Sequence, residues 1–591
     1  MSKELKRLFD LPYYQLEKYP LERSFSSKIN GKWVSISSQQ LVDQANEVSK
    51  GLLAMGIQPG DKVGLISNNR YEWHIMDIGI LQIGAVNVPI YPTISAADYD
   101  YIFNHAELKI VVVSSSEILD KVNSIKEKVP SLTNVFTFEK IEGETHWSEI
   151  KSKGADIELS QVTDLMKEVK TDDMASIIYT SGTTGRPKGV MLSHANILSN
   201  VVASGERFPA RYGQKSISFL PICHIYERSL TYLYMMEGTS VYFAESMETI
   251  GENIKEVKPE VFSAVPRLLE KVFDKIIAKG EELTGAKKML FFWAVDLGEK
   301  WMPNGENGSF YEFKLSIANK LIFSKWREAL GGNVIAISSG SAALQPRLAR
   351  VFNAANIPIF EGYGLTETSP VISVNELENE GLMIGTVGRV INNVQVKFGA
   401  DGEILAKGPN VMLGYYKDPE KTREVLTEDG WFHTGDIGEL VGKTKDFLKI
   451  TDRKKEMFKT SGGKYVAPQL IENMLKESRF VEQAMVIGEN RKHPAVLLVP
   501  AFDFVYEWAK RHDEQVSTPE ELVKNEKVKA RIWKDISRIT ENLGSWEIPK
   551  KMELCSDVWS IENNELTPTL KLKRKVVLEK HQAEIKRIYG E

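Results

Sequence analysis

The segment Tyr179–Gly189, Tyr-Thr-Ser-Gly-Thr-Thr-Gly-Arg-Pro-Lys-Gly, constrains this 591-residue chain more than any other. It follows residues 175–179, whose apolar composition predicts a short buried strand, and Ser193 beyond it is a candidate helix N-cap. Glycines allow backbone N–H groups to surround phosphate oxygens, and Ser and Thr hydroxyls add donors or reach a bound cation. We therefore interpret the segment as a phosphate-binding loop, although an ordinary solvent-exposed turn is the simpler alternative.

The spacing within this loop differs from that of the Walker A motif, in which Ser or Thr directly follows Gly-Lys. Here Arg186 and Pro187 separate Gly185 from Lys188, and Gly189 follows the lysine. The loop instead resembles the phosphate-binding signature of the adenylate-forming superfamily of acyl-CoA synthetases, luciferases and peptide-synthetase adenylation domains. The nucleotide-binding residues implied by this resemblance are Thr180, Ser181, Gly182, Thr183, Thr184, Gly185 and Lys188.

Length and composition indicate a globular protein of at least two domains. The net charge of −5 argues against a general nucleic-acid binder, which would be basic. Cys223 and Cys555 are the two cysteines, so a disulfide framework is not expected and a reducing cytosol fits. The charged N-terminus lacks the apolar run of a signal peptide, and no segment approaches the roughly 20 apolar residues that span a bilayer. We expect a cytoplasmic protein and leave peripheral contact with the inner face of a membrane open.

The pattern along the chain predicts layered α/β structure. Residues 32–170 alternate between helical and strand patterns, with buried strands expected at 62–66 and 109–113. Residues 266–330 are strongly helical and amphipathic and include several aromatic side chains. Helices packed on a sheet are the default interpretation of such apolar stripes, and a membrane-facing patch is the alternative.

A second candidate site surrounds His224, in the segment Leu-Pro-Ile-Cys-His that begins at Leu220. Neighbours in a chain are rarely oriented as nucleophile and base, so Cys223 is not expected to act as a nucleophile. From the residues alone, two interpretations of His224 are equally good: a histidine in the hydrophobic core, or part of the wall of a substrate tunnel. The resemblance favours the tunnel, because acyl-CoA synthetases carry a Leu-Pro…His motif beside the acyl site.

Two stretches of small residues follow predicted strands, at 338–343 and 361–366. Small residues let a flat adenine ring lie against the backbone, and Tyr363 could stack on it. Glu367 is a hard-oxygen ligand suited to Mg²⁺, and Thr184 is the second metal candidate. Further nucleotide-binding candidates from these stretches are Gly340, Ser341, Ala342, Glu361, Gly362, Tyr363, Gly364 and Thr366.

The resemblance becomes more specific toward the C-terminus. Residues 429–438 together with 447–456 resemble the signature of fatty acyl-CoA synthetases, and residues 565–574 look like the terminal motif of the long-chain subgroup. Matching segments run in order from about residue 175 to residue 575. The chain is therefore similar to the long-chain fatty-acid–CoA ligases.

This resemblance implies roles for several residues. Asp436 would accept hydrogen bonds from the ribose hydroxyls, and Arg453 would hold the nucleotide beside it. Lys455 would lie at a hinge. Gly462 and Gly463 would line the tunnel for the pantetheine arm, where a side chain would block a narrow channel.

Lys571 is implied to be the catalytic lysine. Alone, the basic run 571–575 favours a solvated face or a tail drawn to acidic lipid. The preceding Thr567-Pro568-Thr569 supports the catalytic role, while Leu570 replaces the glycine that most relatives outside the long-chain subgroup carry. A second departure is Gly388-Arg389-Val390, where many relatives have Gly-x-Pro.

The resemblance implies an α/β multidomain fold. A large N-terminal adenylate-forming domain of layered β-sheets and helices would span residues 1–454, and a small mobile α+β domain 455–591. The implied reaction converts a long-chain fatty acid and ATP to acyl-AMP, then transfers the acyl group to coenzyme A, with Mg²⁺ as cofactor. A fatty acyl-AMP ligase or acyl-carrier-protein synthetase is the alternative enzyme. A silent lipid or nucleotide binder is a different class, and it is disfavoured because the site residues are retained together.

Overall fold

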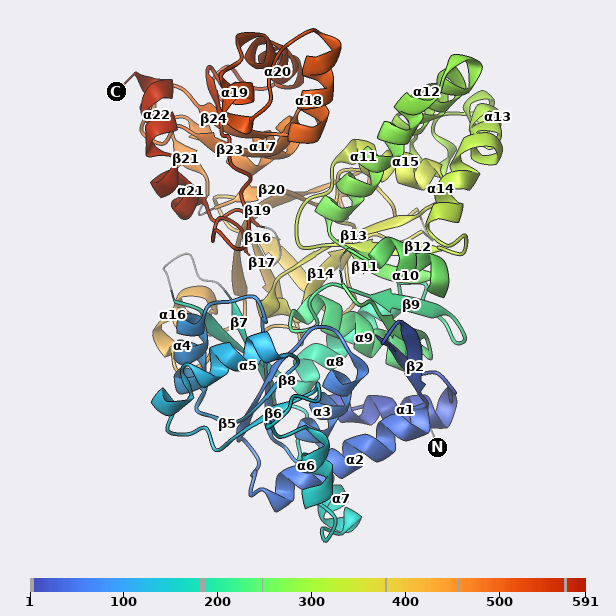
Figure 1. Cartoon of the computed structure of the whole chain (residues 1–591), viewed down its shortest axis with the longest axis vertical. Coiled ribbons are helices and arrows are strands. Elements are labelled where there is room, and N and C mark those ends of the chain that lie inside the picture. The colour runs from blue at the N-terminus through green and yellow to red at the C-terminus, as the bar shows by residue number, and fades with distance from the viewer. Residues whose placement is uncertain are drawn as a thin grey trace. The chain divides into compact units, whose positions relative to one another are not determined.

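The computed structural model describes residues 5–180, 186–246, 248–377, 380–454, 456–567 and 571–590 (Figure 1). They form two compact units. The larger consists of Met1–Val396, Ala406–His433 and Gly442–Leu448, and the smaller of Lys397–Leu405, Thr434–Val441 and Lys449–Glu591. The domain boundary expected after residue 454 stays a prediction.

A seven-stranded sheet in the larger unit has the order β18-β8-β7-β4-β3-β5-β6. Its central strands run parallel, while β8 is antiparallel to both β7 and β18. Both predicted strands, at 62–66 and 109–113, are confirmed, and their near-continuous apolar burial is typical of parallel strands covered on both faces. The strands are β3 (Lys62–Ile66), β4 (Val86–Ile90), β5 (Leu108–Val113), β6 (Asn134–Thr137), β7 (Met174–Thr180), β8 (Lys188–Ser193) and β18 (Gly414–Tyr415).

Helices cover both faces of this sheet. One face packs on α2, α3, α8 and α9, and the other on α4 and α5. Capping boxes fix the starts of α2 and α8, where Ser37 accepts from the N–H of Gln40 and Ser193 from that of Asn196. The predicted N-cap at Ser193 is thus confirmed. The helices are α1 (Leu11–Lys18), α2 (Ser38–Ala54), α3 (Tyr71–Gln82), α4 (Ala96–Ala106), α5 (Ser116–Asn123), α6 (Ser148–Lys153), α7 (Leu159–Glu168), α8 (His194–Gly205) and α9 (Ile225–Glu237).

Nine strands of a second, 13-stranded sheet lie in the larger unit, in the order β15-β14-β13-β12-β11-β9-β10-β1-β2. The strands from β13 to β1 are parallel, and β2, β14 and β15 pair antiparallel with their neighbours. Side chains from both sheets join one hydrophobic core with α3, α8 and α9. The strands are β1 (Phe25–Ile29), β2 (Lys32–Ile36), β9 (Lys215–Ser218), β10 (Ser240–Phe243), β11 (Val261–Ala264), β12 (Ala336–Ser339), β13 (Ile359–Gly364), β14 (Val371–Val374) and β15 (Arg389–Val390).

A group of helices packs on the other face of this second sheet (Figure 1). The predicted helical character of residues 266–330 is confirmed, and Phe291, Phe323 and Trp326 are buried in the core as expected for helices packed on a sheet. The helices are α10 (Ile250–Val257), α11 (Pro266–Glu282), α12 (Gly285–Glu299), α13 (Ser309–Ala318), the π-helical turn η4 (Asn319–Phe323), α14 (Ser324–Ala329) and α15 (Pro346–Ala354).

A fully buried ion pair joins α3 to α9. The Arg228 guanidinium lies 2.6 Å from a carboxylate oxygen of Asp77, and neither side chain is exposed to solvent. Arg228 also donates to the Ser176 hydroxyl on β7 at 2.8 Å and to the Tyr232 hydroxyl at 2.9 Å. The amide of Asn87 on β4 donates to Asp77 at 2.6 Å. This network fixes both helices on β4 and β7, and β7 leads directly into the predicted phosphate-binding loop.

The division between the two units passes through four strands of the order β16-β17-β19-β20. They are β16 (Gln395–Phe398), β17 (Glu403–Lys407), β19 (Phe432–Val441) and β20 (Phe447–Arg453).

The core of the smaller unit is built on a three-stranded sheet of order β23-β24-β25. Alternate residues of β23 enter two separate hydrophobic cores, one under α17, α18 and α20 and the other under α21 and α22 (Figure 1). Residues 502–539 are mostly helical. The elements are β21 (Phe458–Lys459), β22 (Tyr465–Val466), β23 (Val481–Ile487), β24 (Ala495–Pro500), β25 (Met552–Leu554), α17 (Pro468–Leu475), α18 (Phe502–Arg511), α19 (Pro519–Lys524), α20 (Glu526–Ile539), α21 (Arg574–Lys580) and α22 (Gln582–Tyr589).

Within the described part of the chain, none of the helices combines the length and the apolar composition that crossing a bilayer requires.

Candidate active site

The predicted phosphate-binding loop connects two paired strands. Antiparallel β7 and β8 bring its ends together, so that Tyr179 faces Gly189 and Thr180 faces Lys188. A side chain at Gly189 would lie 2.8 Å from Ile177, so this position has no room for one. The five loop residues Ser181, Gly182, Thr183, Thr184 and Gly185 lie outside the described residues. Their assignment to phosphate and metal binding stays a prediction.

Tyr415 connects the strand after this loop to the predicted metal ligand. Its hydroxyl donates to a carboxylate oxygen of Glu367 at 2.9 Å, and the Lys188 ammonium lies 4.9 Å from the centre of its ring. The backbone N–H of Met412 donates to the Glu367 carbonyl at 2.9 Å. Burial and the Glu367 carboxylate both raise the pKa of Tyr415, so its hydroxyl keeps the proton that it donates. Tyr415 thus brings the predicted phosphate ligand and the predicted metal ligand to one place.

The predicted adenine site lies at the ends of two neighbouring parallel strands. Ser339 on β12 is in register with Glu361 on β13, so the stretches that follow, 340–342 and 362–364, lie side by side. Burial raises the pKa of Glu361 to about 8, against the smaller effect of a hydrogen bond from the backbone of Leu344. Glu361 is therefore mostly neutral at pH 7 and can donate a hydrogen bond.

The start of α9 lies against the same strand ends. His224 is the N-cap of α9 and accepts a hydrogen bond from the Tyr226 N–H at 3.1 Å. The Tyr226 hydroxyl lies 2.6 Å from that of Ser338 on β12, and a methyl group added to Gly340 would lie 3.2 Å from the Tyr226 ring. The ring therefore covers the small-residue turn after β12. Tyr226, like Tyr415, was not among the residues predicted from sequence.

Burial disfavours the charged form of two neighbouring side chains. Burial raises the pKa of the Cys223 thiol, so the reactive thiolate is disfavoured. This agrees with the expectation that Cys223 is not a nucleophile. The Glu227 carboxyl is buried and accepts from the hydroxyl of Ser263 on β11. Burial raises the pKa of Glu227 to about 7, with smaller opposing effects from its hydrogen bonds.

The predicted ribose-binding pair lies within the smaller unit. The Arg453 guanidinium at the end of β20 lies 3.2 Å from the carboxylate of Asp436 on β19. Asp436 is buried, and its N–H donates to the Thr434 hydroxyl at 3.1 Å. The ammonium of Lys454 contacts Asp401 at 2.7 Å and Glu403 at 2.8 Å. Lys455, the predicted hinge, lies outside the described residues.

Two further predicted positions of the smaller unit lie on turns. Gly462 and Gly463 form the turn between β21 and β22, and Gly463 has a φ of +74°. Lys571 lies opposite Thr567 across a loop: the Lys571 N–H donates to the Thr567 hydroxyl at 3.0 Å, and the Thr567 N–H to the Lys571 carbonyl at 2.8 Å. Pro568, Thr569 and Leu570 between them lie outside the described residues.

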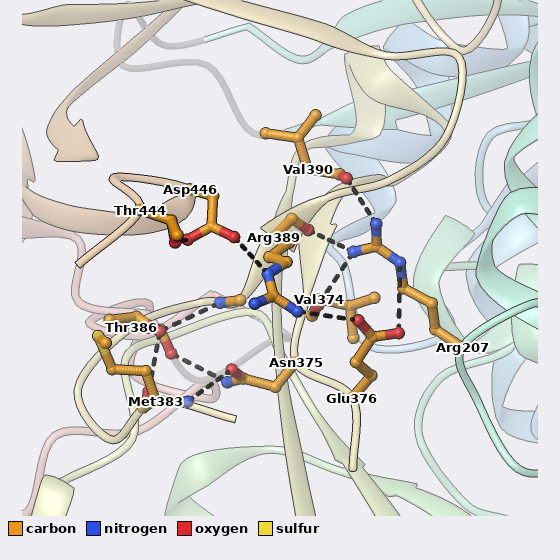
Figure 2. Close-up of polar contacts among 11 residues, drawn as sticks. Arg207, Val374, Asn375, Glu376, Met383, Thr386, Arg389, Val390, Thr444 and Asp446 are labelled. Atoms are coloured by element: carbon orange, nitrogen blue, oxygen red, sulfur yellow. Dashed lines mark hydrogen bonds and ion pairs between the residues drawn. The ribbon is translucent and has the colours of Figure 1, made fainter. Parts of the chain in front are cut away.

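Arg389, at the variable position of the Gly388-Arg389-Val390 segment, is held in a network of ion pairs and hydrogen bonds (Figure 2). Its guanidinium binds Asp446 at 2.6 Å and Glu376 at 3.4 Å, and so fastens β15 to the loops after β14 and before β20. Arg207 at the end of α8 donates to the carbonyl of Arg389 at 2.7 Å. At the preceding Gly388, φ is +79° and a side chain would lie 2.1 Å from the backbone of Val374, so only glycine fits. The network stabilises β15, which pairs with β14 on one side and β20 on the other.

Comparisons with known proteins identify the family. A model of the AMP-binding enzymes matches residues 14–416, and a model of their C-terminal domain matches residues 456–591. The chain belongs to the AMP-binding enzyme family. It is 31% identical to the long-chain-fatty-acid–CoA ligase FadD15 of Mycobacterium bovis, over 95% of this chain and 93% of that protein. It is 33% identical to the peroxisomal long chain acyl-CoA synthetase 6 of Arabidopsis thaliana, over 95% and 82% of the two chains.

Solved structures of low identity share the fold. The adenylation domain of a carboxylate reductase from Mycobacterium chelonae superposes with a TM-score of 0.75 at 22% identity, covering 99% of this chain and 91% of that domain. The layered α/β architecture with a smaller C-terminal part, expected from the sequence, is therefore confirmed.

Proposed function

We infer that the protein is an AMP-forming ligase that joins a long-chain fatty acid to coenzyme A. The fatty-acid carboxylate attacks the α-phosphorus of ATP, which gives acyl-AMP and releases pyrophosphate. The coenzyme A thiol then attacks the acyl carbonyl, which gives the thioester and releases AMP. Relatives named as long-chain ligases match nearly the whole chain, and the meeting of Lys188 and Glu367 at Tyr415 is the structural observation that carries the proposal.

The chemical problem is the poor leaving group of a carboxylate, which would depart as oxide. Conversion to a mixed anhydride makes AMP the leaving group. The reaction must bring two anions together and neutralise the charge that develops on the α-phosphate, so positioning and electrostatic stabilisation supply the catalysis. Lys188 in the larger unit and Lys571 in the smaller are the cations that we assign to this task.

We assign the metal site to Glu367, with Thr184 as the second candidate. Mg²⁺ is held in many enzymes by one or two protein oxygens together with substrate phosphates. When bound, it would neutralise charge on the phosphates of ATP. The donor set fits, because the Tyr415 hydroxyl fixes one oxygen of the Glu367 carboxylate. The Lys188 ammonium lies over the ring of the same tyrosine.

Asp436 and Arg453 are assigned to the ribose of the nucleotide. A buried carboxylate with an ionised partner is a strong acceptor for two adjacent hydroxyl groups. The pair is already formed at 3.2 Å, with Asp436 buried and Arg453 partly exposed, so Arg453 also fixes the orientation of Asp436.

We assign the acyl group to the surface formed by His224, Tyr226 and Gly340. The Tyr226 ring lies against Gly340, one of the residues predicted to contact the nucleotide. Such a wall would hold the reacting carboxylate beside the nucleotide site. The tunnel interpretation of His224 remains a proposal that mutation of Tyr226 would test.

The first half-reaction can be tested without coenzyme A. Labelled pyrophosphate should exchange into ATP only when a fatty acid is present, because exchange requires reversible formation of acyl-AMP. Palmitate or oleate should support exchange, and acetate should not. Absence of exchange with every acid would contradict the proposed function.

The first prediction concerns Tyr415. Tyr415→Phe keeps the ring under Lys188 but removes the hydrogen bond to Glu367, so we expect the Mg²⁺ concentration for half-maximal exchange to rise about 10- to 100-fold. The measurement is the exchange rate as a function of Mg²⁺, with the KM for the fatty acid determined in parallel. Tyr416→Phe is the matched control, and an unchanged Mg²⁺ requirement in Tyr415→Phe would refute the role in positioning Glu367.

The second prediction concerns Gly462. A methyl group there would meet its nearest neighbour, the Thr460 hydroxyl, only at 3.8 Å, so the turn has room for a β-carbon. We expect Gly462→Leu to keep pyrophosphate exchange and to lose thioester formation, because the side chain would block the proposed pantetheine tunnel. Normal thioester turnover in this variant would reject the tunnel assignment.

A further inference from the structure

The most exposed apolar side chains of the described residues gather in one helical region of the larger unit. Met289 is 75% exposed, Phe310 is 73% exposed and Phe313 is 63% exposed, more than any other large hydrophobic residue described. Leu321 in the same region is 46% exposed. These residues lie on α12, α13 and η4, and α12 and α13 run side by side (Figure 1).

Helix α13 is apolar on two faces. Leu315 and Ala318 are buried in the core, as expected for the inner face of a helix packed on its neighbours. Phe310 and Phe313 lie three residues apart and therefore share the outer face. The outer face of a surface helix is normally polar. Packing within the unit does not explain these two phenylalanines.

Lysines accompany this exposed face. The Lys314 ammonium lies 4.4 Å from the centre of the Phe310 ring, and Lys320 and Lys325 are exposed nearby. Residues 285–325 contain six lysines and four acidic residues, so this segment is positive within a chain of net charge −5.

The acidic residues of the segment do not neutralise the face. Asp296 is paired with Lys300 at 2.7 Å, and Glu299 lies 3.9 Å from Arg347. Glu306 and Glu312 are exposed. Glu312 lies two residues from Phe310 and one from Phe313, and residues so spaced do not share a helix face.

We propose that Met289, Phe310, Phe313 and Leu321, with Lys314 and Lys320, form a surface that docks on an anionic lipid bilayer; we name it the α12–α13 face. Aromatic and aliphatic side chains interleaved with lysines are the pattern of helices that lie in a membrane interface. Lysine stems extend along apolar surface while their ammonium groups reach lipid phosphates. Lysines close to an anionic membrane surface are attracted by its negative potential.

A lipid surface explains the charge of this face better than a second copy of the chain does. Two copies meeting through the α12–α13 face would place lysines against lysines. The inference rests on the proposed function in one respect: a long-chain fatty acid partitions into bilayers, so docking would bring the enzyme to its substrate.

The test measures sedimentation of the full chain with vesicles of phosphatidylcholine alone and of phosphatidylcholine with phosphatidylserine. We expect binding to the anionic vesicles, and at least about tenfold weaker binding for Phe310→Gln/Phe313→Gln, because each exposed ring buries apolar area in the interface. Lys314→Glu/Lys320→Glu should also weaken it. The matched control is Leu159→Gln/Val202→Gln, which changes two exposed apolar residues of the larger unit away from the face and should bind as the unmodified protein does.

Several results would overturn the proposal. These are no binding to anionic vesicles, equal binding to both vesicle types, or unchanged binding by the Phe310/Phe313 variant. Self-association without lipid that the same variant abolishes would assign the face to a protein interface instead. Pyrophosphate exchange with octanoate in detergent-free buffer should be equal in all variants, so failure of docking is distinguishable from failure of the proposed reaction.

Discussion

Lys571→Ala is expected to slow acyl-AMP formation about a thousandfold, which corresponds to about 3–4 kcal/mol of lost transition-state stabilisation. The proposed role of the ammonium is to bridge the fatty-acid carboxylate and the α-phosphate while negative charge builds up between them. Alanine removes the charge but keeps the backbone hydrogen bonds between Lys571 and Thr567 that close the loop. The measurement is fatty-acid-dependent pyrophosphate exchange.

The same variant separates the two half-reactions. In thioester formation from supplied acyl-AMP and coenzyme A, the thiol attacks the acyl carbonyl and the α-phosphorus is not attacked, so this step should be nearly unchanged in Lys571→Ala. Lys575→Ala is the matched control, because this exposed lysine lies four residues further along the same basic run. An equal loss in both half-reactions would show that Lys571 supports the fold or both steps, and would contradict the assignment.

Arg228→Met is expected to reduce the free energy of unfolding of the larger unit by about 3–5 kcal/mol. The variant leaves the Asp77 carboxylate fully buried with neutral donors, of which Asn87 at 2.6 Å is one. Removing one partner of a buried ion pair is more damaging than removing both, because an uncompensated charge remains in the core. The measurement is urea unfolding followed by tryptophan fluorescence.

The double variant Arg228→Met/Asp77→Leu provides the control. Apolar replacement of both partners is often neutral or stabilising, so this variant should recover most of the lost free energy. If the double variant is no more stable than Arg228→Met, the loss arises from packing around α9 and not from the unpaired charge.

The sequence predicted those parts of the structure that depend on local pattern. Buried strands such as 62–66 appear as short apolar runs, and Ser193 appears as a helix N-cap before Asn196. The pairing of Asp436 with Arg453 followed from the resemblance, and the two side chains lie 3.2 Å apart. These features need few contacts between distant segments.

Contacts made only in the tertiary structure were not predicted. Tyr415 lies 48 residues after Glu367, and nothing in its local sequence marks the hydrogen bond between them. Tyr226 follows the predicted residue His224 by only two positions in the sequence. This proximity could have been used to predict that Tyr226 lies at the site. Phe310 and Phe313 have the helical spacing of core residues. They are nevertheless exposed, because Leu315 and Ala318 form the face of this helix that packs in the core.

Fatty-acid activation and transfer to coenzyme A are tested most directly by measuring the products formed from ATP, Mg²⁺, coenzyme A and a series of acids from acetate through octanoate to oleate. AMP and thioester are quantified together, the thioester by mass. We expect equal amounts of AMP and acyl-CoA, with palmitate and oleate as preferred acids. AMP or acyl-AMP without thioester would contradict coenzyme A as acceptor and indicate an acyl-AMP ligase or a carrier-protein acceptor. Absence of AMP with every acid would contradict fatty-acid activation itself.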